Sequence, residues 1–198
     1  MMKLAILVTG GTFDKEYNEL TGSLFFRQTH LPEMLALGRC RLALRVQRVM
    51  MKDSLDMTPA DRQRILRSCL LARESKLVIT HGTDTMEQTA RFLAPHITNK
   101  TVVLTGAMIP FRFGSSDGLF NLGGAIAFAQ TLPVGVYVAM NGRYFFWDQV
   151  TKNRERGCFV ETKDRSRIGR RSGASAGSGA KKKPQVFRSQ DSESRISH

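Results

Sequence analysis

No long apolar segment occurs in this sequence. The first apolar run, residues 4–8, is too short for the apolar region of a secretory signal, and it leads into Thr9-Gly10-Gly11-Thr12 instead of a small-residue cleavage site. No later run approaches the roughly 20 apolar residues of a membrane-spanning helix. We therefore expect a cytoplasmic protein with no membrane partner.

Cysteine and the common ligand-binding patterns are also scarce. The three cysteines, Cys40, Cys69 and Cys158, lack the spacing of metal ligands, and an odd number fits no closed disulfide framework. Neither G-x-G-x-x-G nor G-x-x-x-x-G-K-[ST] occurs, which argues against a bound nucleotide. We expect reduced thiols, no metal ion and no cofactor.

Acidic residues are few compared with basic ones, 17 against 30, and the formal net charge is +13. Residues 163–198 hold ten basic and three acidic residues, a net of +7, which leaves +6 for the first 162 residues. Residues 165–183 are almost wholly Arg, Lys, Ser, Gly and Ala, without a periodic apolar face. We expect one domain over residues 1–162, followed by a disordered basic tail over residues 163–198.

The basic tail raises the alternative of a nucleic-acid partner. Lys181-Lys182-Lys183-Pro184 would attract phosphates, but Phe187 is the only aromatic residue of the tail and no nucleic-acid-binding fold is recognisable. Nucleic-acid binding is therefore the weaker interpretation, and a solvated terminus is preferred.

The first 162 residues carry the pattern of an α/β fold. Short apolar runs suited to buried parallel strands alternate with segments of helical periodicity, which indicates βαβ units. We predict a doubly wound, mainly parallel sheet, and we expect the aromatic cluster of residues 144–147 in a short hairpin or loop. The predicted strands are 4–8, 42–49, 77–80, 101–105 and 134–140.

Two helices are well marked. Thr58 is a candidate N-cap and Pro59 fits the first helical position; the buried stripe of this helix is predicted to be Ile65, Leu66, Cys69 and Leu70. A later helix over about 116–130 contains Gly123 and Gly124, which we expect to permit close approach to the sheet.

The first motif with chemical potential is Val8-Thr9-Gly10-Gly11-Thr12. It places two glycines and a hydroxyl at the carboxyl end of the first strand, where open parallel sheets bind ligands. Glycines let backbone N–H groups come close to a substrate. Taken alone, the segment is equally typical of a tight turn.

The second motif, Thr80-His81-Gly82-Thr83-Asp84-Thr85, also follows an apolar strand. Thr83 or Asp84 could serve only as the N-cap of the following helix, residues 86–93. Both motifs, however, end at the same sheet edge, so Thr12, Thr83 and Asp84 should converge there. Converging hydroxyls, a carboxylate and free N–H groups favour a site that cleaves an amide.

These two motifs resemble the two signatures of the bacterial-type L-asparaginase family. Further matches, in the order of that family from about residue 3 to residue 159, are 53–57, 104–108 with 116–118, and 150–153. The resemblance implies the flavodoxin-like N-terminal domain of the family, a homo-oligomer, and hydrolysis of L-asparagine to L-aspartate and ammonia.

Catalytic roles follow from the same resemblance. Thr12 would be the nucleophile that forms an acyl-enzyme. Thr83, Asp84 and Lys152 would form a second catalytic group, in which Thr83 supplies the family's second hydroxyl and Lys152 is its activating lysine. A threonine hydroxyl needs an adjacent base, and a lysine acts as a base only in its neutral form, which burial or a neighbouring cation favours. Tyr17, five residues after Thr12, is the alternative proton carrier.

Substrate-binding roles are implied for Gly11, Ser54, Thr83 and Asp84, with Ser54 and Asp84 expected to hold the α-carboxylate and α-ammonium groups of the substrate. The sequence departs from the family in two ways. Leu55 stands where many relatives carry a polar substrate-binding residue, and the sequence ends before the second domain that supplies an acidic residue to a neighbouring subunit in long-chain members.

Two alternatives to an asparaginase remain open. One is hydrolysis of glutamine or another small amide, and the other is a non-catalytic asparaginase-like binding module. The presence together of Thr12, Thr83, Asp84 and Lys152 favours turnover, because drift after loss of catalysis has no reason to spare all four.

Overall fold

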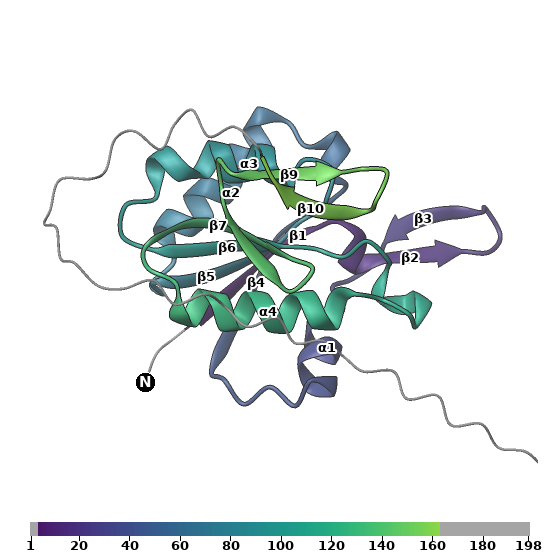
Figure 1. The fold of residues 1–198 in the computed structure, drawn as a ribbon. Helices are drawn as coiled ribbons and strands as arrows, with labels where there is room; N and C mark the ends of the chain where they lie inside the picture. Colours follow the sequence, from purple (N-terminus) through teal and green to yellow (C-terminus); the bar gives the residue numbers. More distant parts are fainter. Residues whose placement is uncertain (1–3, 163–198) are drawn as a thin grey trace, which may run out of the picture. The chain divides into compact units, whose positions relative to one another are not determined.

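A computed structural model of the chain describes residues 4–162 (Figure 1). These residues belong to one compact unit, Met1–Asp164. The tail that the sequence predicts to be disordered, residues 163–198, lies outside the described residues.

A six-stranded sheet forms the centre of the described unit, in the order β4-β1-β5-β6-β7-β8. The first five strands are parallel and only β8 runs antiparallel to its neighbour, so the predicted doubly wound, mainly parallel sheet is confirmed. The strands are β1 (Leu4–Gly10), β4 (Leu44–Lys52), β5 (Lys76–Thr80), β6 (Thr101–Thr105), β7 (Gly135–Met140) and β8 (Arg143–Phe146).

Helices cover both faces of this sheet (Figure 1). Side chains alternate along β1, with Leu7 in the core shared with α2 (Pro59–Leu71) and α3 (Met86–Leu93), and Ile6 in the core shared with α1 (Leu31–Leu37) and α4 (Gly118–Thr131). Burial on both faces explains why the central strands are continuous apolar runs. Residues 4–162 also form four short 3-10 helices: η1 (Thr12–Asp14), η2 (Ser54–Asp56), η3 (Ala94–His96) and η4 (Phe111–Phe113).

Helix α2 begins where the sequence predicted. The Asp61 N–H donates to Thr58 Oγ1 at 3.3 Å, and the Thr58 N–H donates to Asp61 Oδ2 at 2.8 Å, which is a complete capping box. Its predicted stripe was wrong at one residue: Leu70 is 52% exposed, because it lies about a quarter turn beyond Cys69 and points away from the sheet.

The expected role of the α4 glycines was wrong. Within the described part of the chain, a Cβ atom at Gly123 would meet no heavy atom within 4 Å, and one at Gly124 would meet only Phe128, at 3.8 Å. The crowded glycine is Gly118 at the start of α4, and it approaches α1 and η1 and not the sheet: a Cβ atom there would lie 3.1 Å from both Met34 and Phe13.

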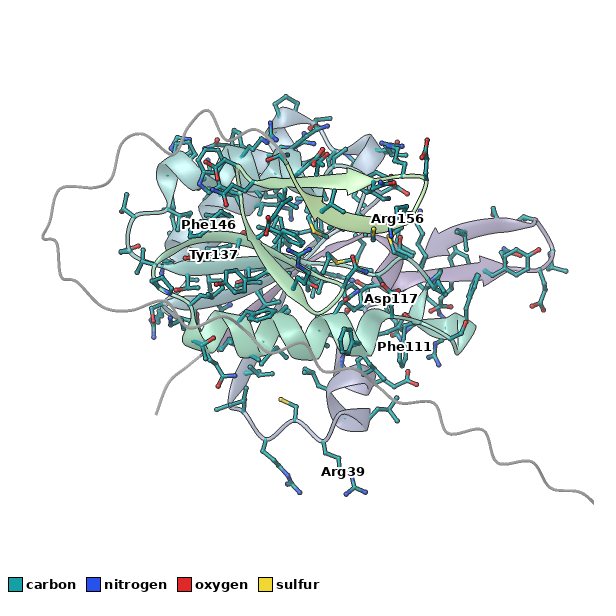
Figure 2. All side chains as sticks on the ribbon, viewed as in Figure 1. Arg39, Phe111, Asp117, Tyr137, Phe146 and Arg156 are labelled. Carbon is teal, nitrogen blue, oxygen red and sulfur yellow. The ribbon has the colours of Figure 1, made fainter. Side chains whose placement is uncertain are left out.

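Three hairpins complete the unit. The predicted aromatic hairpin is confirmed: β7 turns at Asn141 into β8, and the rings of Tyr137 and Phe146 lie 5.0 Å apart (Figure 2). The other two are separate two-stranded sheets, β2 (Lys15–Asn18) with β3 (Ser23–Phe26) and β9 (Val150–Asn153) with β10 (Cys158–Glu161). Among the helices of residues 4–162, none is both long and apolar enough to cross a membrane.

Candidate active site

The polar residues singled out in the sequence follow the carboxyl ends of three adjacent strands. Thr12 comes two residues after β1, Ser54 two residues after β4, and Thr83 three residues after β5. Because these strands are parallel, the three turns meet at one edge of the sheet, which is where doubly wound proteins bind ligands.

Two glycines bring these turns into direct contact. Gly11 has φ +80°, and a Cβ atom there would overlap the backbone nitrogen of Gly82. On its other side, a Cβ atom at Gly82 would lie 2.5 Å from Ser54 Oγ. Only glycine allows this approach, so the turns that carry Thr12, Thr83 and Ser54 form one continuous polar surface.

Lys152 reaches this surface from β9. Its ammonium group donates to Thr83 Oγ1 at 2.8 Å and to Asp84 Oδ1 at 2.9 Å, and its side chain is only 11% exposed. The structure therefore brings together the three residues that the family resemblance grouped. Thr85, and neither Thr83 nor Asp84, is the N-cap residue of α3, so the capping alternative for these two side chains was wrong.

The Thr12 hydroxyl is accessible. Thr12 is half-buried at the start of η1, and its Oγ1 makes no hydrogen bond with any other residue of the described range 4–162. The N–H of Gly11 donates to the Lys52 carbonyl at 3.1 Å, so Gly11 contributes its small size and not a free N–H group.

Ser54 is buried but lacks a partner for its side chain. It is 1% exposed, and within residues 4–162 its hydroxyl makes no hydrogen bond. Its carbonyl accepts a bond of 2.8 Å from Thr85 Oγ1, which fixes η2 against the start of α3. Buried polar groups are nearly always paired, so this unpaired hydroxyl is an exception beside the polar edge of the sheet.

Tyr17 lies on β2, opposite Leu24, and is 54% exposed. Its phenol makes no hydrogen bond within residues 4–162. The ion pair of Lys15 with Asp53 joins the start of this hairpin to the turn after β4. The hairpin is thus fixed at its base, and the role of Tyr17 stays a prediction.

Two supporting residues were not recognised in the sequence, because nothing in their local pattern predicts burial. His81 is fully buried; its Nδ1–H donates to the Gly82 carbonyl at 2.8 Å, and its Nε2 accepts from Thr89 Oγ1 at 2.8 Å. Burial lowers the pKa of His81 to about 4, so the ring is neutral near pH 7. Through these two hydrogen bonds, His81 holds the turn at Gly82 against α3.

Asp14 fastens η1 in a similar way. It is 0% exposed, and its Oδ1 accepts from the His30 N–H at 2.9 Å and from Thr29 Oγ1 at 3.0 Å. Burial raises the pKa of Asp14 to about 6. The segment that carries Thr12 is therefore attached to the start of α1.

The matched segments 104–108 and 116–118 have a structural role. The carboxylate of Asp117 accepts from the N–H groups of Met108 and Ile109 at 2.9 and 3.1 Å, and it lies just before α4 (Figure 2). Asn121 donates to the Gly106 carbonyl at 3.0 Å and accepts from the Asn141 N–H at 3.0 Å. Together they hold the loop after β6 beside the site.

The fold and this edge define a doubly wound α/β domain whose polar residues converge at the carboxyl ends of its strands. The family model "Asparaginase, N-terminal" matches residues 3–170. The chain belongs to the asparaginase family.

Individual relatives agree with this assignment. The chain is 32% identical over 156 residues to an L-asparaginase of Thermococcus kodakarensis, a match that covers 76% of this chain and 48% of the relative. It is also 32% identical over 154 residues to a glutaminase-asparaginase of Pseudomonas fluorescens, with 71% and 42% covered. The solved structure of the thermostable L-asparaginase from Thermococcus kodakarensis superposes with a TM-score of 0.72 at 32% identity, covering 81% of this chain and 51% of that one. The chain spans about half the length of the curated relatives it matches.

Proposed function

We propose that this chain is an amide hydrolase that converts L-asparagine to L-aspartate and ammonia. The observation that carries the proposal is the contact of Lys152 with Thr83 and Asp84. Neither α3 nor the β9–β10 hairpin requires this contact for its own hydrogen bonds. A lysine brought from a separate sheet to a hydroxyl and a carboxylate is typical of a site that moves protons.

The proposed reaction has two halves. Thr12 Oγ attacks the side-chain amide carbon, its proton passes to the departing nitrogen, and the C–N bond breaks to release ammonia. Water then attacks the resulting ester, which frees aspartate and restores the Thr12 hydroxyl. Thr83 and Lys152 are the proposed proton carriers, with Tyr17 as the alternative.

The substrate's α-groups are assigned to the other two side chains. The unpaired Ser54 hydroxyl donates to the α-carboxylate, and the outer oxygen of Asp84 accepts from the α-ammonium, while Oδ1 of Asp84 stays with Lys152. Glutamine is the second candidate substrate, because a relative named for both activities covers most of this chain.

The experiment is an ammonia-release assay on the purified full chain with L-asparagine and L-glutamine. We expect release from asparagine without added metal or cofactor, loss of activity in Thr12→Val, and measurable activity in Thr12→Ser, which keeps the hydroxyl. A folded protein that releases no ammonia from either amino acid between about pH 6 and 10 would leave the binding-module alternative instead.

A further inference from the structure

The positive charge of the first 162 residues is concentrated in one stretch of sequence. Residues 39–73 hold nine Lys or Arg and three Asp, a net of +6, which equals the whole net charge of residues 1–162. This stretch comprises the loop before β4, β4 itself and α2. This stretch of the chain is therefore strongly basic, and the rest of residues 1–162 is balanced.

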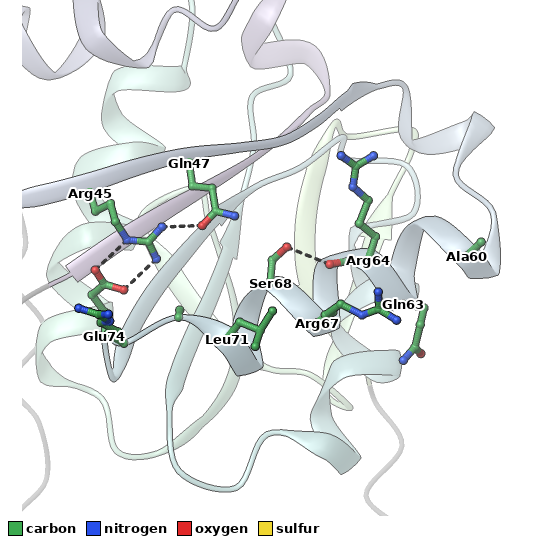
Figure 3. A pocket seen from close by; sticks show the side chains of 11 residues that line it. Arg45, Gln47, Ala60, Gln63, Arg64, Arg67, Ser68, Leu71 and Glu74 are labelled. Atoms are coloured by element: carbon green, nitrogen blue, oxygen red, sulfur yellow. Dashed lines mark hydrogen bonds and ion pairs between the residues drawn. The ribbon is translucent and has the colours of Figure 1, made fainter.

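A groove of about 980 Å³ lies within this basic region, between β4 and α2. Figure 3 shows Arg45 and Gln47 of β4 on one side and Arg67, Ser68 and Leu71 of α2 on the other. It is separate from the candidate active site, since Arg45 and Gln47 lie in the first half of β4 and the site follows its carboxyl end.

Among the described residues, Glu74 is the only carboxylate that lines the groove, and its charge is already neutralised. Glu74 accepts from Arg45 Nε and Nη2, both at 2.8 Å, and the hydrogen bond from Arg45 holds its pKa down to about 2. Arg64, Arg67 and Arg73 also line the groove, and no carboxylate of residues 4–162 pairs with them. Three guanidinium groups therefore remain available to an anionic ligand.

The groove also runs along a free strand edge. β4 is the last strand of the sheet and pairs only with β1, so its outer backbone N–H and C=O groups have no strand partner within residues 4–162. It is nine residues long, and Arg45, Val46 and Arg48 are exposed on it. The arginines disfavour pairing with a basic or apolar strand, but an edge of this length can accept an added strand of acidic residues.

We propose that this groove binds an extended acidic segment of another protein, which pairs with the edge of β4 and directs its carboxylates to Arg64, Arg67 and Arg73. Two independent features fit this one partner: the strand edge complements a peptide backbone, and the arginines complement alternate acidic side chains. Nucleic acid fits less well, because none of the residues in the described range that line the groove is aromatic, and bases therefore have no ring to stack on.

The test uses the full chain and a fluorescent peptide of alternating Glu and Thr, about as long as β4. The ten basic residues of 163–198 attract any acidic peptide, so the contribution of the groove to peptide affinity is obtained by comparing two variants of the full chain. Arg64→Gln with Arg67→Gln is compared with Arg27→Gln and Arg91→Gln, which removes the same charge from exposed positions elsewhere. We expect binding about tenfold weaker in the groove variant than in the control.

Two further arms identify the partner's chemistry. A peptide N-methylated at every residue keeps its carboxylates but has no N–H group to donate to a strand on either edge, and it should bind the unsubstituted chain weakly. The unmodified peptide should slow hydrogen exchange at alternate β4 amides. Equal affinity in both arginine variants, unchanged binding of the N-methylated peptide, or groove-dependent binding of oligouridylate in place of the peptide would each overturn the proposal.

Discussion

Lys152 connects two residues that precede α3 with a hairpin about 70 positions further along the chain. If it is a proton carrier, Lys152→Met should remove most of kcat while the protein stays folded. Arg154→Met is the matched control, since Arg154 approaches the same Asp84 at 3.8 Å but is 70% exposed. Steady-state kinetics with asparagine measure both variants.

Combining Lys152→Met with Thr83→Val should cost little more than either change alone, because residues that act as a unit are not additive. A near-normal kcat in Lys152→Met would favour Tyr17 as the proton carrier, and Tyr17→Phe tests that assignment directly.

A substitution at Ser54 should have opposite effects on substrate binding and on the stability of the fold. The buried Ser54 hydroxyl has no partner within residues 4–162, so Ser54→Ala should raise the free energy of unfolding by up to about 1 kcal/mol. The same change should raise KM and leave kcat almost unaltered, because the α-carboxylate does not react. Thr80→Val is the control: its buried hydroxyl is also unpaired, so stability should rise without a change in KM. A Ser54→Ala enzyme with normal KM would contradict the assignment.

Asp14 should give the protein a specific dependence on pH. Its pKa rises from 3.8 unfolded to about 6 folded, so the folded state binds the proton more tightly. The stabilisation is fully present below about pH 3.8, is lost as the pH rises through 6, and corresponds to on the order of 3 kcal/mol.

Urea unfolding of Asp14→Asn and of the unsubstituted chain tests this between about pH 4 and 7. The stability of the variant relative to the unsubstituted chain should increase with pH over that range. The comparison between variants is needed because His81, with a pKa lowered to about 4, contributes the opposite slope. A difference that stays constant with pH would contradict the prediction.

At the scale of elements, the turn after β1 is the most constrained. Gly11→Ala places a Cβ atom against Gly82 and holds an L-residue at φ +80°. Gly22→Ala, at φ +69°, would place its Cβ atom more than 4 Å from every other heavy atom of residues 4–162, so it carries only the backbone cost. Both changes should lower stability by about 1 kcal/mol or more, and only Gly11→Ala should also abolish ammonia release. Equal activities would show that the contact between the turns is dispensable.

The sequence predicted most of the central elements but not the short ones. Strand 101–105 and helix 86–93 have the predicted bounds, because both are set by apolar patterns that fill a two-sided core. The predicted strand 42–49 instead runs from Leu44 to Lys52, since its edge position weakens the apolar signal. The hairpins β2–β3 and β9–β10 were missed, because strands of four mixed residues depend on tertiary contacts.

The candidate site was predicted in the same uneven way. Thr83, Asp84 and Lys152 could be grouped only through the resemblance to a family, since local pattern gives no reason to expect Lys152 in the site. Asp14 and His81 were not recognised, because their burial depends on α1 and α3 packing over the turns. Secondary-structure propensity indicates whether a residue belongs to a helix or a strand, but it does not indicate which other elements pack over that residue and bury it.

For the whole molecule, the described fold ends with a hydrogen bond from the Thr162 N–H to the Gln149 carbonyl at 3.1 Å. We predict that a chain ending at Thr162 keeps the melting temperature and turnover of the full chain, measured by circular dichroism and ammonia release. Because the family match extends to residue 170, a second truncation after Arg170 is the control. If the chain ending at Arg170 is active and the chain ending at Thr162 is not, the domain extends beyond the predicted boundary at residue 162. Light scattering of the same samples tests the predicted homo-oligomer.

A Cβ atom at Gly11 would meet the backbone of Gly82, and a Cβ atom at Gly82 would meet Ser54, so a side chain at either glycine would displace a neighbouring turn. Loops usually diverge independently of one another, but these three turns cannot. An insertion in one turn must be compatible with the backbone of both others. The same coupling sets a rule for engineering. Moving this site into another scaffold requires the segments after β1, β4 and β5 to be transplanted as a single unit.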